Sequence, residues 1–170
     1  MWEDIAQISA SIDDVLEAVV SVRAQIPEDA LSADVLGSER SGHGVVIRED
    51  GLVLTIGYLI ADAEQVWIGI DDETLVPACV IASDYETGFG LLQPTLPVDL
   101  PWVELGSSGY LEIDEPVFVV GSGGIGDTIE ASVVAKQEFA GRWEYLLDEA
   151  VYTAPAHHSW AGAALLNHVG

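Results

Sequence analysis

The chain has 170 residues and carries 29 acidic against 5 basic side chains, a formal net charge of −24. A charge of this sign repels a phosphate backbone, so it excludes nucleic acid as a partner, and it favours a solvated acidic surface or a basic partner. The longest apolar run, residues 52–61, is far shorter than the ~20 residues that span a bilayer, so we expect no transmembrane segment. The single cysteine, Cys79, excludes an internal disulfide, and its apolar neighbours predict a small core residue.

In chain order, residues 1–18 place apolar side chains at spacings of three and four, which predicts an amphipathic N-terminal helix. Residues 19–26 alternate and predict a strand, and residues 27–42 mix Pro, Gly, Ser and acids and predict a long exposed loop. Short apolar segments then alternate with glycine and acidic turns, among them the hairpin signal Asp50-Gly51. The pattern favours an all-β sandwich or barrel, in which the apolar run at 52–61 is one strand.

Prolines in the middle of the chain divide it into two halves. Pro94, Pro97 and Pro101 fall within eight residues, where they break any strand. We therefore expect a helix over 1–18, a first β-barrel over 19–94, a linker over 95–101 and a second β-barrel over 102–170.

Four segments together resemble one family, the trypsin-like serine proteases of the HtrA/Deg type. They match the family runs G-S-G-x-x-I…D-G-x-I-x-T-N-x-H-V-V, D-x-x-T-D-I-A-L-L-K, L-G-x-S-x-x-L-x-x-G and N-S-G-G-P-L-L-N in order and spacing. In this chain the segments are "SGHGVVIREDGLVLTIGYLIADAEQVWIGIDDE", "VIASDYETGFGLLQP", "LPWVELGSSGYLEIDEPVFVVGS" and "HHSWAGAALLN". The resemblance covers residues 41–167.

The resemblance implies two six-stranded antiparallel barrels with an active site in the cleft between them. In the family a further strand completes the second barrel, so we expect that barrel to be incomplete at the C-terminus of this chain. Relatives commonly assemble as trimers and act mostly in the periplasm or at the cell envelope. The first residues of this chain show no secretory signal, so the sequence itself predicts no compartment.

The catalytic triad of the family is replaced at all three positions. The histidine falls on Tyr58, the aspartate on Gly88 and the serine on Ala161. A phenol with a pKa of about 10 is no base near neutral pH, and neither glycine nor alanine carries a functional group. The oxyanion loop is also changed, with Ser159 and Trp160 before Ala161. The resemblance thus implies a pseudoprotease whose cleft is shielded by Trp160.

Ser159 lies beside His157 and His158, so a shifted serine–histidine pair is an alternative. Adjacent residues of an extended segment point to opposite sides, so at most one of the two histidines is expected to face a given site. No carboxylate in this loop could orient its ring. The same two histidines are weak candidates for metal ligands, because a vicinal pair lacks the spacing that brings both rings to one ion, and His43 is isolated.

The glycine-rich stretch "GSGGIGDT" at 121–128 has neither the lysine nor the following helix of a phosphate-binding loop and predicts a turn. We expect no metal and no cofactor. The sequence predicts a catalytically inactive HtrA-like homologue that binds a protein or peptide partner, and its acidic charge favours a basic one. The resemblance implies homotrimers. The alternatives are an active serine endopeptidase with a non-standard site and a metal-binding or structural module.

Overall fold

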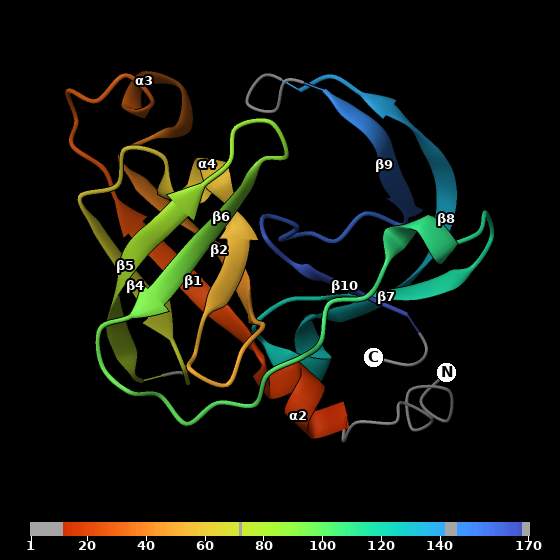
Figure 1. The fold of residues 1–170 in the computed structure, drawn as a ribbon, viewed down its shortest axis with the longest axis horizontal. Coiled ribbons are helices and arrows are strands. Elements are labelled where there is room, and N and C mark those ends of the chain that lie inside the picture. The colour runs from red at the N-terminus through yellow and green to blue at the C-terminus, as the bar shows by residue number, and fades with distance from the viewer. Residues whose placement is uncertain (1–11, 72, 142–145, 168–170) are drawn as a thin grey trace.

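The structure is a computed structural model, and it describes residues 12–71, 73–141 and 146–167. The protein is all-β: a closed six-stranded antiparallel barrel lies beside a curled four-stranded sheet (Figure 1). This arrangement confirms the trypsin-like double-barrel fold expected from the sequence. Among the described residues, no helix is long and apolar enough to cross a membrane.

The first six strands form the barrel and precede Pro97 and Pro101, and the last four strands follow these prolines. The barrel contains β1 (Val19–Gln25), β2 (Glu39–Val46), β3 (Val53–Ile56), β4 (Gln65–Gly69), β5 (Leu75–Ser83) and β6 (Phe89–Pro94). The second sheet contains β7 (Pro116–Val120), β8 (Thr128–Phe139), β9 (Leu147–Ala154) and β10 (Ala164–Leu166). The described helical segments are α2 (Ile12–Glu17), α3 (Ala33–Leu36), α4 (Gly57–Ile60), η1 (Ser108–Tyr110) and η2 (Gly124–Asp127).

The barrel closes in the order β1-β2-β3-β6-β5-β4, with β4 pairing back to β1. Alternate residues of β1, such as Val20 and Val22, point into the barrel, as the two-residue period of a strand requires. They pack there against Val53, Ile68 and Leu92, which are fully buried. This apolar interior gives the first half of the chain its own core.

The second sheet has the order β10-β7-β8-β9, and β7 lies in its buried centre. Helix α2 covers the seam between the two units, because Val15 and Leu16 form one cluster with Phe118 and Leu166. Figure 1 shows α2 at the lower edge, below β7 and β10. The apolar face of this short helix is therefore used inside the chain.

Three expectations from the sequence need correction or restriction. The stretch 27–42 is not one loop, because it contains α3 and the first residues of β2. The run 52–61 is not one strand, because β3 ends at Ile56 and α4 follows it. Of the helix predicted over 1–18, residues 1–11 lie outside the described residues.

Cys79 was predicted to be a core residue, but it is exposed. It lies in β5, where Val80 and Ile81 are also exposed, at 40% and 56%. The prediction was wrong because an apolar stretch indicates a strand but not which neighbours cover it. All residues of β5 from Cys79 to Ser83 are exposed.

We expect Leu92→Ala to lower the free energy of unfolding by about 2–5 kcal/mol, because the fully buried side chain would leave a cavity in the barrel. Leu96→Ala is the matched control, since Leu96 is 60% exposed, and we expect a change within about 0.5 kcal/mol. Denaturant unfolding followed by circular dichroism measures both. Equal effects of the two substitutions would contradict the placement of Leu92 in the core.

Candidate functional site

The loop between β9 and β10, residues 155–163 and hereafter the terminal loop, docks directly on β2. The backbone N–H of His43 donates to the carbonyl oxygen of Ala161 at 2.8 Å. This approach requires glycine at two positions: a Cβ on Gly42 would lie 2.5 Å from the Ala161 oxygen, and Gly162 has φ = +77° and faces the His43 backbone. The terminal loop is thus fixed to the first barrel by backbone contacts.

The three predicted triad positions lie in α4 or in segments that contact α4. Tyr58 lies in α4 and Gly88 in the β5–β6 connection, and the N–H of Gly57 donates to the Gly88 carbonyl at 2.6 Å. The Tyr58 ring meets the Trp160 ring edge-on, with centroids 6.1 Å apart. Tyr58 and Ala161 also pack against the same barrel core. The structure therefore brings α4, the β5–β6 connection and the terminal loop together.

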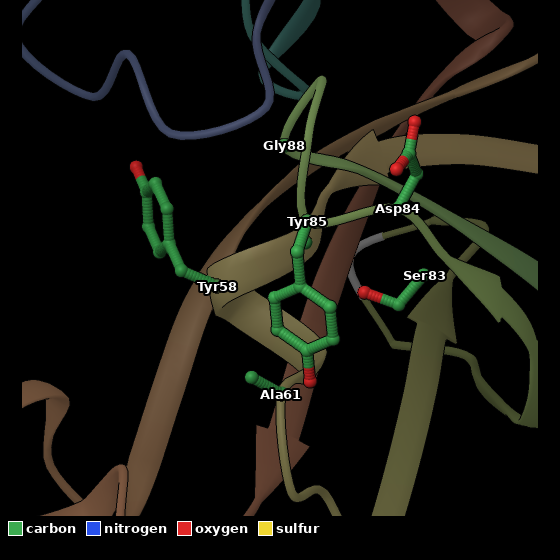
Figure 2. A pocket seen from close by; sticks show the side chains of 7 residues that line it. Tyr58, Ala61, Ser83, Asp84, Tyr85 and Gly88 are labelled. Atoms are coloured by element: carbon green, nitrogen blue, oxygen red, sulfur yellow. The ribbon is translucent and has the colours of Figure 1, made fainter. Parts of the chain in front are cut away.

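The chemistry offered by these positions is poor. Figure 2 shows a small pocket in which the Tyr58 ring extends toward the terminal loop, while the Tyr85 ring points over Ala61. Gly88 has φ = +78°, a conformation that favours glycine, so a carboxylate at this position would be strained. Trp160 is 62% exposed, so it covers Tyr58 from outside and does not fill a buried cavity.

Arg40, which the sequence analysis did not single out, holds α4 in place. Its guanidinium is buried and donates to the carbonyl oxygens of Tyr58 at 2.7 Å and Ala61 at 3.0 Å, and to Ser32 Oγ at 2.8 Å. Burial lowers the pKa of Arg40, and the charge of Asp62 raises it. One of the five basic residues of the chain thus forms hydrogen bonds with the backbone of the helix that carries Tyr58.

His43 is not isolated, contrary to the prediction. Its ring is buried between the barrels, where Nε2 lies 3.0 Å from Ser159 Oγ and Nδ1 lies 3.0 Å from Ser122 Oγ. The backbone N–H of Ser122 also donates to Nδ1 at 3.0 Å. Residues from β2, from the segment after β7 and from the terminal loop therefore meet at one imidazole.

These contacts fix the tautomer of His43. Because Nδ1 accepts the Ser122 N–H, a neutral ring carries its proton on Nε2. The Nε2–H then donates to Ser159 Oγ, so it cannot also receive the serine proton. A serine nucleophile needs the opposite arrangement, with Nε2 as the acceptor and a carboxylate at Nδ1.

His157 and His158 both face Asp127, which corrects the expectation that at most one of them could face a given site. Their Nε2 atoms lie 3.4 and 3.2 Å from Asp127 Oδ1, and their rings stack with centroids 4.6 Å apart. The expectation assumed an extended segment, whereas these residues lie in a turn. The carboxylate comes from η2, in the glycine-rich stretch that the sequence analysis identified as a turn.

His157 is also held by the backbone. Its Nδ1 accepts the N–H of Ser159 at 3.1 Å, and its Nε2 lies 2.9 Å from the carbonyl oxygen of Asp127. Ser159 is thus bound at both its N–H and its hydroxyl by two different histidines. No sequence signal predicted this network, because the contacts that join its three segments link residues 30 or more positions apart in the chain.

Comparison with known proteins gives consistent results. Residues 42–170 match the family described as "Trypsin-like peptidase domain". A "Probable periplasmic serine endoprotease DegP-like" of Pseudomonas fulva is 33% identical over 95 residues, which is 55% of this chain and 20% of that protein. The corresponding protein of Rickettsia prowazekii is 31% identical over 98 residues, covering 56% and 19%.

Solved structures agree on the fold. An "HtrA-type protease AlgW with tripeptide" has a TM-score of 0.76 at 18% identity and covers 100% of this chain and 52% of its own. The same protease with a decapeptide has a TM-score of 0.69 at 18% identity and covers 100% and 56%. The chain therefore spans about half the length of these solved structures and about a fifth of the curated relatives it matches.

We expect stability to fall on acidification through His43. Burial lowers the pKa of its imidazole; Asp127 and the contact with Ser159 raise it, and His157 and His158 lower it. The folded state thus prefers the neutral ring, whereas the unfolded ring takes up a proton near a pKa of about 6.5. The stabilising contribution is full above that value and is lost as the pH falls below it.

The measurement is the free energy of unfolding at about pH 7.5 and about pH 5.5 for the wild type and for His43→Gln, which does not titrate. We expect a smaller loss of stability in the variant than in the wild type. Identical losses would show that the other titrating groups alone set the pH dependence.

Proposed function

Because the chain belongs to the trypsin-like peptidase domain family, we propose that it is a catalytically inactive, HtrA-like member that acts by binding a protein or peptide. The observation that carries the proposal is the composition of the triad positions. Tyr58 lies in α4, and Gly88 and Ala161 lie in two segments that contact α4, the β5–β6 connection and the terminal loop. They offer neither a nucleophile nor a base there.

The alternative function, a serine endopeptidase with a non-standard site, is favoured by one observation, the 3.0 Å contact between Ser159 Oγ and His43 Nε2. The tautomer argues against it, because the N–H of Ser122 leaves the proton of His43 on Nε2. Among the described residues, no carboxylate accepts a hydrogen bond from Nδ1, whose contacts are with Ser122. The charge of Asp127 raises the pKa of the ring without such a bond. In this arrangement Ser159 accepts a hydrogen bond and is not activated.

Two features support a peptide as the partner. The similar HtrA-type structures named above carry a tripeptide and a decapeptide. In this chain two exposed aromatic residues lie beside the pocket that Tyr58 lines. Trp160 is 62% exposed and contacts the Tyr58 ring, and Phe89 is 54% exposed and follows Gly88, which also lines the pocket. Exposed aromatic side chains next to a cleft suit the apolar contacts of an extended peptide.

The net charge of −24 favours a partner with basic residues. Assembly into homotrimers remains a prediction from the resemblance, and light scattering of the purified chain tests it.

We expect no covalent adduct when the protein is incubated with a fluorophosphonate probe, which reacts only with activated serines. Intact-mass spectrometry measures the result, and a related active serine protease treated in parallel shows that the probe is competent. A single adduct mapped to Ser159 would show that this serine is activated. It would contradict the proposal and support the endopeptidase alternative.

We expect Trp160→Ala to weaken binding of a basic extended peptide by roughly tenfold, because the exposed ring beside Tyr58 would be lost. Trp102→Ala is the matched control, since Trp102 is also exposed, at 45%, but lies in the segment that joins the two units. Fluorescence anisotropy with a labelled Lys/Arg-rich peptide measures both affinities. Equal weakening by both substitutions, or peptide cleavage, would contradict binding at this place.

A further inference from the structure

We propose that Asp127, His157 and His158 form a binding site for a divalent transition-metal ion of the zinc class, held between η2 and the terminal loop. The three ligand atoms, one from each residue, all lie within 4.8 Å of one another. This inference does not rest on the proposed function, because its three residues are not those of the Tyr58–Trp160 contact.

The distances fit a tetrahedral ion. Bonds of about 2.0–2.2 Å in tetrahedral geometry place neighbouring ligand atoms roughly 3.3–3.5 Å apart. The separations from Asp127 Oδ1 to the Nε2 atoms of His157 and His158 are 3.4 and 3.2 Å. Two of the three ligand pairs thus already lie close to the required spacing.

The three side chains differ in how far they are exposed. The side chain of His157 is fully buried and that of Asp127 is 17% exposed, so their positions are set by packing. The side chain of His158 is 73% exposed and can turn to complete the site without disturbing the core. Two imidazoles and one carboxylate are ligands that zinc accepts, and three protein ligands leave one position for water.

The hydrogen bonds define what metal binding would change. In the described arrangement His157 accepts the Ser159 N–H at Nδ1, so its own proton is on Nε2, facing the Asp127 carbonyl. An ion bound at Nε2 requires that proton to move to Nδ1, with no change in the charge of the ring. The Ser159 N–H then loses its acceptor, a cost that is small beside the binding energy of structural zinc.

Metal binding is therefore coupled to the terminal loop. Because Ser159 also meets His43 and precedes Trp160, an ion at this site would loosen the Ser159 backbone on one side of the contact with the first barrel. The alternative is that the two histidines only form hydrogen bonds with Asp127. That alternative predicts the same contacts without metal, but no saturable binding of an ion.

The test is isothermal titration calorimetry of the metal-free protein with zinc chloride, in excess magnesium that occupies nonspecific acidic sites. We expect one zinc ion per chain. Asp127→Asn and His158→Ala should each lower the affinity at least tenfold. His157 is left unchanged in this series because its burial makes a folding defect the expected result of replacing it.

Asp99→Asn is the matched control, because it removes one exposed negative charge outside the site and should leave the affinity unchanged. A second readout is nitrogen-15 NMR of the His157 ring, in which zinc should move the protonated nitrogen from Nε2 to Nδ1. No saturable heat in magnesium, equal weakening by Asp99→Asn and Asp127→Asn, or an unchanged affinity in His158→Ala would each overturn the proposal. A fluorophosphonate adduct would leave it untouched, so the two proposals fail separately.

Discussion

The docking of the terminal loop on β2 is the contact on which the rest of the candidate site depends. One backbone hydrogen bond, from His43 N–H to the Ala161 carbonyl, joins the second sheet to the barrel at this point. It is possible only because Gly42 and Gly162 leave room for the two backbones to approach. The contact fixes the distance between the strand that carries His43 and the loop that carries His157, His158 and Ser159.

Two histidines then immobilise the same serine. Each accepts a backbone N–H at its Nδ1 atom, His43 from Ser122 and His157 from Ser159. A backbone N–H that donates to Nδ1 fixes the tautomer of a neutral ring, because the backbone cannot rotate its proton away and the ring proton must lie on Nε2. The fold thereby keeps a serine–histidine contact of catalytic length while directing its proton the wrong way, so distance alone does not make a catalytic pair.

Strand alternation, glycine and acidic turns and the mid-chain prolines predicted the all-β architecture, because these patterns depend on neighbours along the chain. Where burial depended on a neighbouring element, the same patterns failed. Cys79 lies in an apolar run but in the exposed second half of β5. Residues 57–60 turn into α4, where the buried Arg40 binds the Tyr58 carbonyl, and no local pattern announces a partner 18 residues away.

The sequence by itself determined the fold class, the resemblance to a protease family and the residue types at the three triad positions, because these follow from local pattern and chain order. The tertiary structure alone decided that His43 meets Ser159, 116 residues away, and that Asp127 gathers both His157 and His158. Such contacts join segments from different strands and turns. Their geometry is set by the packing of two sheets against each other, which spacing along the chain does not encode.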